Sequence, residues 1–246
     1  KRYGSMLGGV PRTFVMLPEG TDSPSTFEID AFVAGVNEGR TFGTNGPFVR
    51  VQAENATGDS ASLGDTLATA GEPVSFQIVV EFPEWMQVDR LDVYMNVDDV
   101  IMPAGEYDTS PIPPTHSYPI ELVDEDLEVV HDGQSVHRRY LKVLDIELES
   151  DVDAYVVFMV HGMETAPIYP AILGRSVRAF AFTNPIYLDA DGGGYDNPHL
   201  NELAQSAPPM AYRRADRVEL DADELDSGRL TPADLTRIFH ELTCSH

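Results

Sequence analysis

The apolar positions of the chain change from helical spacing to alternation at about Phe48. Over residues 23–39 they recur every three or four positions, which is typical of a helix with one apolar face. Ser25 and Glu28 have the spacing of an N-terminal capping box, and Gly39 stands where a helix ends. We therefore predict a helix here, after a short strand at 12–17. Its apolar face comprises Ile29, Phe32, Val33 and Val36.

From Phe48 onward, apolar and polar residues alternate, which indicates strands that each bury one face. The turn at 149–153 separates two of these strands, and we expect the two to pair as a hairpin. Residues 59–72 and the proline-rich 103–119 are expected to be loops. Several short strands separated by turns predict a mostly β fold, a β-sandwich. The predicted strands cover residues 48–51, 74–81, 88–96, 140–148, 154–161 and 177–188.

The charge balance limits the partners of the chain. There are 41 acidic and 16 basic residues, a formal net charge of -25. Such a surface repels nucleic acid and anionic membranes and attracts cations. Because the acidic residues are spread along the chain, a dispersed, salt-adapted surface is the favoured interpretation. No apolar run reaches the ~18 residues of a membrane span.

The residues that usually carry catalysis are scattered. The seven histidines form no H-x-H, H-E-x-x-H or D-x-H pair, the patterns in which hydrolytic metal centres often gather ligands. The one cysteine, Cys244, excludes an internal disulfide and a thiolate zinc site. Neither a G-x-S-x-G nucleophile elbow nor a phosphate-binding loop is present. We therefore expect this chain alone to be inactive.

One acidic loop has a composition suited to a hard cation. Asp189 and Asp191 alternate before three glycines, and Tyr195 and Asp196 follow. The two carboxylates, the Tyr195 carbonyl and an oxygen of Asp196 would supply oxygen ligands for calcium. The match to an EF-hand loop is partial, because a glycine and a leucine stand at two ligand positions. The alternative is a solvated turn that leaves a strand.

A turn-rich connector at 40–47 follows the predicted helix. Its polar residues Arg40, Thr44 and Asn45 are candidates to face a substrate, because polar side chains on such loops often do. The favoured alternative is a structural joint, since Asn-Gly-Pro at 45–47 suits a tight turn before a strand.

Three separated segments share a pattern with one enzyme family. They are Gly8-Gly-Val-Pro-Arg-Thr-Phe-Val15, Ala34-Gly-Val-Asn-Glu-Gly-Arg-Thr-Phe-Gly-Thr-Asn-Gly-Pro47 and Phe182-Thr-Asn-Pro-Ile-Tyr-Leu-Asp-Ala-Asp191. Their order and separation resemble the C-terminal half of the CehA/McbA-type metallohydrolases of the PHP (polymerase and histidinol phosphatase) superfamily. The second segment is the most specific. Residues 84–96 also look like the β-region of that family, and the resemblance extends to Pro198.

In that family, a distorted β/α barrel holds divalent metals through His, Asp and Glu, and an Asp-x-His element supplies the last ligands. That element would stand just before Lys1, so we expect the catalytic ligands to lie upstream of this chain. The activity implied is hydrolysis of a small ester or phosphoester by metal-activated water; secretion or a periplasmic location is implied by analogy. The implied parts are 1–47, the last strand and helix of the barrel; 48–191, an immunoglobulin-like β-sandwich; and 192–246, an acidic, loop-rich tail with a C-terminal helix.

The resemblance thus implies a non-catalytic downstream region of a metal-dependent hydrolase, with the upstream barrel as its partner. Without that barrel, residues 1–47 should expose apolar surface at Phe14, Phe32 and Val36, or pack loosely on the sandwich. Two alternatives stay open. One is a structural surface protein of a salt-adapted organism. The other is a free-standing, calcium-stabilised β-sandwich for carbohydrate binding or adhesion, with a sugar-facing surface drawn from Trp85, Tyr94, Tyr118 and Tyr187.

Overall fold

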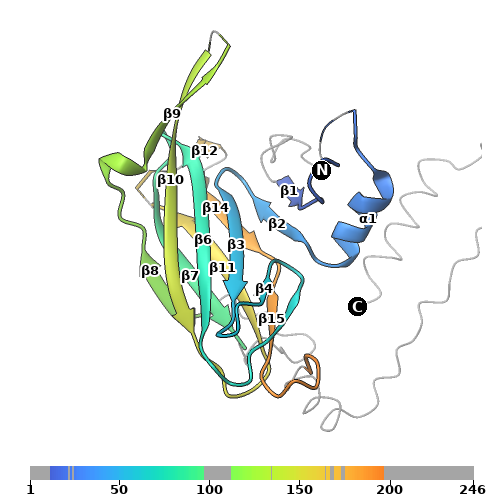
Figure 1. The fold of residues 1–246 in the computed structure, drawn as a ribbon. Helices are drawn as coiled ribbons and strands as arrows, with labels where there is room; N and C mark the ends of the chain where they lie inside the picture. Colours follow the sequence, from blue (N-terminus) through green and yellow to red (C-terminus); the bar gives the residue numbers. More distant parts are fainter. Residues whose placement is uncertain are drawn as a thin grey trace, which may run out of the picture. The chain divides into compact units, whose positions relative to one another are not determined.

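The computed structural model describes residues 12–21, 23, 25–96, 112–133, 135–163, 165–166, 169–172 and 175–196. Over these residues the chain is mostly β, and its strands form two principal sheets packed as a β-sandwich (Figure 1), which confirms the predicted fold class. The immunoglobulin-like type of sandwich stays a prediction. The predicted C-terminal helix and the tail from residue 197 onward lie outside the described residues.

The smaller sheet has five antiparallel strands in the order β4-β3-β6-β10-β9. In its central strand β6, every second residue is apolar and points into the core. This alternation is the pattern that predicted the strand. The bounds are β3 Phe48–Glu54, β4 Ser60–Ala61, β6 Val74–Pro83, β9 Leu127–Asp132 and β10 Ser135–Leu148.

The larger sheet has the order β1-β2-β14-β11-β15-β5, and β7 and β8 extend it from β11. Strand β11 pairs with β7 along one edge and with β14 and β15 in succession along the other. A separate pair, β12 Tyr169–Ile172 and β13 Arg175–Val177, stands apart from both sheets. The bounds in the larger sheet are β1 Arg12–Val15, β2 Thr41–Thr44, β5 Thr66–Ala68, β7 Val88–Met95, β8 His116–Pro119, β11 Ala154–Gly162, β14 Phe180–Thr183 and β15 Ile186–Asp189.

The core lies between the two sheets. Phe76 of β6 and Phe158 of β11 meet there with ring centroids 5.4 Å apart, and both side chains are almost fully buried. Their contact joins the central strands of the two sheets. Burying an apolar side chain of this kind contributes about 1.5–3 kcal/mol, so the apolar layer is the main source of stability.

The predicted hairpin of 140–148 with 154–161 is wrong. Strand β10 pairs with β6 and β9 in the smaller sheet, whereas β11 belongs to the larger sheet. The turn at 149–153 therefore carries the chain from one sheet to the other. Alternation shows that each strand buries one face, but two strands on opposite sides of a core alternate in the same way as two strands of one hairpin.

Other predicted boundaries also change. The strand predicted at 177–188 divides into β14 and β15 at Asn184-Pro185, because proline cannot donate to a β ladder. The predicted loop 59–72 contains the short strands β4 and β5, and the predicted loop 103–119 ends in β8. Strand β9 was not predicted. Very short strands such as β4 and β5 depend on tertiary pairing more than on their own pattern.

Residues before Pro47 add to the larger sheet. Strand β1 pairs with β2, and β2 pairs with β14. Helix α1 spans Ile29–Asn37, so it begins later than predicted. The predicted capping box does not form: Glu28 is the N-cap residue without a side-chain cap, and Ser25 bonds to Ser23 in the preceding turn. That residues 1–47 derive from a barrel stays a prediction.

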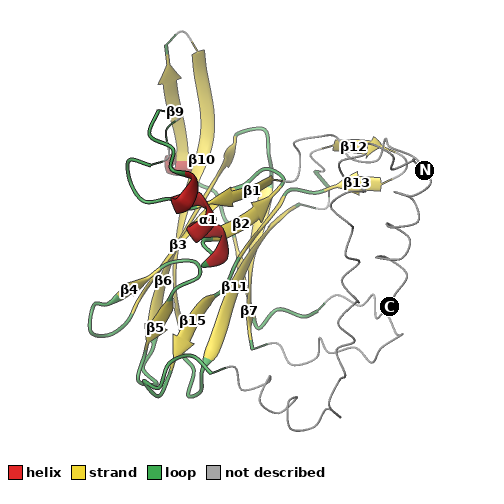
Figure 2. Ribbon diagram, turned by 90° about the vertical axis from the view of Figure 1, so that its right-hand side faces the viewer, coloured by secondary structure: helices red, strands yellow, loops and turns green. Residues whose placement is uncertain are grey.

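Helix α1 lies beside β1 (Figure 2). Gly35 is its one buried residue, and a Cβ there would stand 2.8 Å from Cγ1 of Val15. The larger apolar side chains face away, and Phe32 and Val36 are exposed as expected. Phe14 instead packs on the sandwich, the other expected arrangement: it is half-buried and stacks on Phe42 at 5.1 Å.

The end of α1 contacts the sandwich through Gly64. This residue has a positive φ of 85°, a conformation that favours glycine. A Cβ at this position would overlap the carbonyl oxygen of Glu38, the C-cap residue of α1. The Gly64 N–H also donates to Pro185 O at 2.8 Å. Gly64 therefore allows the close approach that fixes α1 on the sandwich.

We expect Gly64→Ala to lower the free energy of unfolding more than Gly58→Ala, measured by urea denaturation. Gly58 has a similar φ of 88° but no atom within 4 Å of the added Cβ, so it is the matched control. Both substitutions carry backbone strain of about 1–2 kcal/mol. Only Gly64→Ala adds the steric clash with Glu38, which costs on the order of 1–3 kcal/mol more. Equal losses for the two variants would contradict the close contact.

Candidate functional site

Three aspartates converge at one end of the larger sheet. Asp189 is the last residue of β15 and is buried, Asp191 lies in the loop that follows, and Asp153 precedes β11. One carboxylate oxygen from each lies within 4.8 Å of the other two. Over the part of the chain that the structure describes, this is the one such group of three or more His, Cys, Asp or Glu.

The pairing of β11 with β15 brings Asp153 to this loop. Ala154 faces Leu188 in the antiparallel register, so Asp153 and Asp189 end adjacent strands. The sequence analysis missed Asp153, because it treated 149–153 as a turn within one sheet. The available signal was a carboxylate immediately before a strand that could pair with the strand ending at Asp189.

The glycine loop folds around the carboxylates. Gly192 and Gly194 donate their N–H groups to the two oxygens of Asp189, at 2.7 and 2.9 Å. Both glycines have positive φ, which lets the backbone turn toward Asp189. Gly193 donates to Asp191 at 2.7 Å. The predicted pair Asp189 and Asp191 is thus brought together in one loop.

Asp153 holds both ends of the same loop. Its two oxygens accept hydrogen bonds from the backbone N–H of Ala190 at 2.8 Å and of Asp196 at 2.6 Å. Asp196 therefore contributes its backbone, and its carboxylate is not in the converging group. These contacts fix the loop against β11 whether or not an ion is bound.

Tyr195 contributes packing to this end of the sheet. Its ring lies on Tyr187 of β15, with centroids 4.6 Å apart. Burial, together with the neighbouring Tyr187, raises the pKa of Tyr195 to about 12. Its hydroxyl is buried without a hydrogen-bond partner in the described part of the chain. The predicted contribution of the Tyr195 carbonyl to a cation site stays a prediction.

The donor set of the three aspartates fits a hard divalent cation. Calcium takes six to eight oxygen ligands, including carboxylates that bind through one oxygen. A carboxylate oxygen that accepts one N–H keeps a second lone pair, so the loop hydrogen bonds do not use up the ligands. Three neighbouring carboxylates also repel one another, and a cation between them would remove that repulsion. Water and backbone carbonyls would complete the coordination.

The three connector residues occupy different environments. Asn45 is buried. Its side-chain amide donates one hydrogen bond to the backbone just before β14 and accepts one from the backbone N–H of the first residue of β14, each 2.7 Å long. The buried Thr44 hydroxyl donates to a carbonyl of the following turn at 2.6 Å. Arg40 is partly exposed and lies 2.9 Å from Glu38. Thr44 and Asn45 have the contacts of a structural joint; a role toward substrate stays a prediction.

A second polar cluster lies on the outer face of the larger sheet. Asp92 of β7 is buried and accepts a hydrogen bond from Ser117 at 2.7 Å. The Arg90 guanidinium lies 3.0 Å from the same carboxylate, and Nε2 of His161 lies 2.9 Å from it, off hydrogen-bond geometry. The Ser117 hydroxyl donates to Asp92 rather than to His161. The cluster therefore lacks the order of a Ser-His-Asp triad.

His161 is held in its neutral form near neutral pH. Burial lowers the pKa of His161, Arg90 and Arg178 lower it further, and Asp92 and Asp89 act in the opposite direction. Since the burial contribution is the largest, the neutral imidazole is favoured. This cluster joins β7, β8 and β11 electrostatically on the face opposite to the core.

Comparison of the chain with protein-family models, curated proteins and solved structures found no match. Across the described ranges, no helix is long and apolar enough to cross a membrane.

We expect acidification to destabilise the protein partly through His161. Below the ordinary histidine pKa of 6.5, His161 of the unfolded chain binds a proton. The native His161 stays neutral to a lower pH, because its pKa is lowered. The free energy of unfolding should therefore fall between pH 6.5 and the lower pKa of the folded state. His161→Gln should reduce this slope in urea titrations at pH 7 and pH 5, with His131→Gln, on the exposed β9, as the matched control. An unchanged slope in His161→Gln would contradict the assignment.

Proposed function

We propose that this chain is a non-catalytic, sandwich-bearing region of a larger metal-dependent hydrolase, and that α1 docks it to the catalytic barrel. Three motif segments that resemble CehA/McbA-type metallohydrolases support the proposal. The upstream barrel would hold the divalent metals, which would activate water and polarise a small ester or phosphoester. The residues of this chain position and stabilise that barrel.

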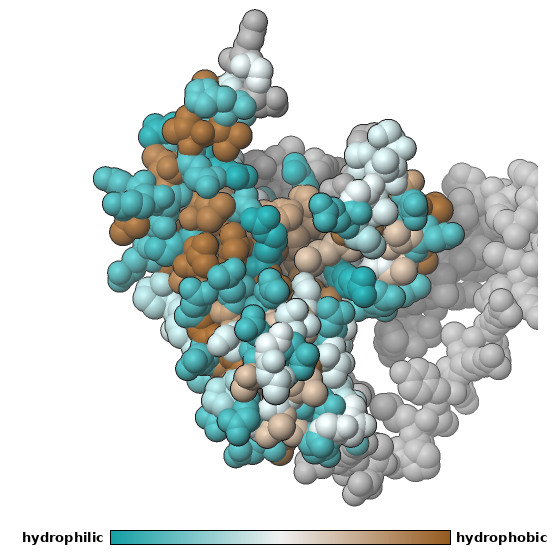
Figure 3. All heavy atoms as spheres, viewed as in Figure 1, coloured by the Kyte–Doolittle hydropathy of each residue, from teal (hydrophilic) through white to brown (hydrophobic). Residues whose placement is uncertain are grey.

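The observation that carries the proposal is the outward apolar stripe of α1. Ile29, Phe32, Val33 and Val36 are 68%, 37%, 49% and 47% exposed, and Phe27 just before the helix is 51% exposed. Hydrophobic atoms reach the surface in the region of α1 (Figure 3). Residues spaced this way on a surface helix normally face a core. Here the side turned to the sandwich carries Gly35 instead.

An exposed stripe of this size indicates a missing partner. Each apolar side chain in it would gain about 1.5–3 kcal/mol on full burial. Contiguous apolar patches on monomers commonly mark interaction surfaces. The stripe is also rigidly presented, because β1 and β2 flank α1 and belong to the larger sheet, and Gly64 packs on its C-terminal end. These features suit a surface that meets a preceding domain.

We expect the isolated chain to hydrolyse no bis(4-nitrophenyl) phosphate when Mn²⁺ is added. The natural protein extended upstream of Lys1 should hydrolyse it, and chelation with EDTA should abolish the activity. Phe32→Ser with Val36→Ser in the extended protein should lower the Tm of the barrel. The same pair of substitutions should leave the Tm of the isolated chain unchanged, because both side chains are exposed there.

Two results would contradict this proposal. One is Mn²⁺-dependent hydrolysis by the isolated chain that scales with its concentration. The other is an upstream sequence without paired His, Asp and Glu residues ending in Asp-x-His. The first result would make the chain itself a hydrolase, and the second would return it to the alternative of a free-standing sandwich.

Calcium binding at the aspartate group is a second candidate function, favoured by the three converging carboxylates. Bound calcium would stabilise the folded loop by mass action, since the unfolded chain does not assemble the three carboxylates. We expect calcium to raise the Tm of the wild-type chain and to raise it much less in Asp153→Asn. Asp151→Asn, an exposed neighbour outside the group, is the matched control. A calcium response that is absent, or equal in Asp153→Asn, would remove this candidate.

A further inference from the structure

The one tryptophan of the chain is exposed on a rigid turn. Trp85 is 69% exposed, whereas Phe82 and Met86 on either side are almost completely buried. The Met86 N–H donates to Pro83 O at 2.9 Å and closes the turn. This turn carries the chain from β6 in the smaller sheet to β7 in the larger sheet. The fold therefore holds the indole outward while anchoring the residues around it.

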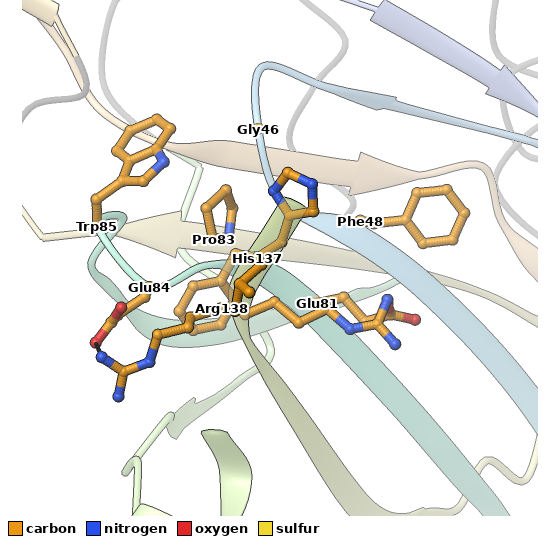
Figure 4. A pocket seen from close by; sticks show the side chains of 11 residues that line it. Gly46, Phe48, Glu81, Pro83, Glu84, Trp85, His137 and Arg138 are labelled. Carbon is orange, nitrogen blue, oxygen red and sulfur yellow. Dashed lines mark hydrogen bonds and ion pairs between the residues drawn. The ribbon is translucent and has the colours of Figure 1, made fainter. Parts of the chain in front are cut away.

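Trp85 borders an open cavity of about 750 Å³. Figure 4 shows Pro83 between Trp85 and His137, with Glu84 and Arg138 close by. Three segments supply the cavity: the end of β6 with the turn after it, the start of β10, and the start of β3 with Gly46 before it. Tyr94, Tyr118 and Tyr187 are half-buried on strands of the larger sheet and do not line it. Among the four aromatic candidates, Trp85 alone belongs to this cavity.

The charged groups of the cavity balance one another. Glu84 lies 2.9 Å from Arg138, and Glu81 lies 2.7 Å from Arg139. Glu81 also pairs with Arg50, outside the cavity. The cavity therefore carries little net charge in a protein whose formal net charge is -25. The pairs are partly exposed, so they still offer both N–H donors and carboxylate acceptors to a ligand.

We propose that this cavity binds a neutral saccharide, with a sugar ring stacked on Trp85. A sugar ring has an apolar C–H face that suits an indole and hydroxyls that both donate and accept. The cavity offers this combination: an exposed aromatic face beside balanced donors and acceptors from Glu84, Arg138 and His137. A charged ligand would have to break the ion pairs. This inference is independent of the hydrolase proposal, because it uses neither α1 nor a metal.

Trp85 also provides the readout of the test. Because Trp85 is the one tryptophan of the chain, the tryptophan emission reports on this cavity alone. Cellohexaose, xylohexaose, mannohexaose, maltohexaose and chitohexaose should be titrated at millimolar concentration, with hexagalacturonate as the anionic comparison. We expect at least one neutral hexasaccharide to shift the emission to shorter wavelength and to release heat in calorimetry.

Substitutions at and away from Trp85 test whether the saccharide binds at this cavity or elsewhere on the surface. Trp85→Ala should weaken calorimetric binding about tenfold or more, as loss of a central aromatic contact commonly does, and Trp85→Phe should recover part of it. Arg138→Gln should weaken binding less. Phe27→Ala removes an exposed aromatic residue elsewhere and should bind as the wild type does. Melting curves establish that each variant is folded.

Three results would overturn the inference. The first is an absence of emission change and heat with every neutral hexasaccharide. The second is undiminished binding by folded Trp85→Ala. The third is a response to hexagalacturonate alone, which would assign the cavity to an anionic ligand. None of these results bears on hydrolysis by the extended protein, so failure here leaves that proposal standing.

Discussion

The burial of one face of each sheet is the constraint on which the structure depends. Strands β6 and β11 turn every second side chain into a shared apolar layer, where Phe76 meets Phe158. The inner-facing side chains of these central strands are therefore used for packing. Polar chemistry is left to strand ends, crossover turns and outer faces. The three aspartates at the end of β15 and the Trp85 turn after β6 both occupy such places.

Helix α1 departs from this rule and is informative for that reason. Its apolar stripe has helical spacing, yet the helix packs through Gly35 and leaves the stripe in solvent. A glycine allows close approach to β1 but adds little apolar area. The interaction that the stripe is built for is therefore absent from the described residues. A partner that covers it would complete an apolar layer outside the sandwich.

The sequence was sufficient to predict those elements that a local period of apolar residues determines. Alternation located β6, β7, β10 and β11, and helical spacing identified the stripe of α1 before its exposure was known. It was insufficient where the structure depends on which strands meet. The hairpin was misassigned because alternation does not say which sheet a strand joins. Asp153 was missed for the same reason, since only the register of β11 with β15 brings it to Asp189.

We infer from the exposed stripe that α1 is an interface helix, which the proposed upstream domain would cover. Hydrogen–deuterium exchange of the α1 amides, compared between this chain and the natural protein extended upstream, tests it most directly. We expect strong additional protection of residues 29–37 in the extended protein, with exchange in β6 unchanged. Equal exchange of α1 in the two proteins would contradict it.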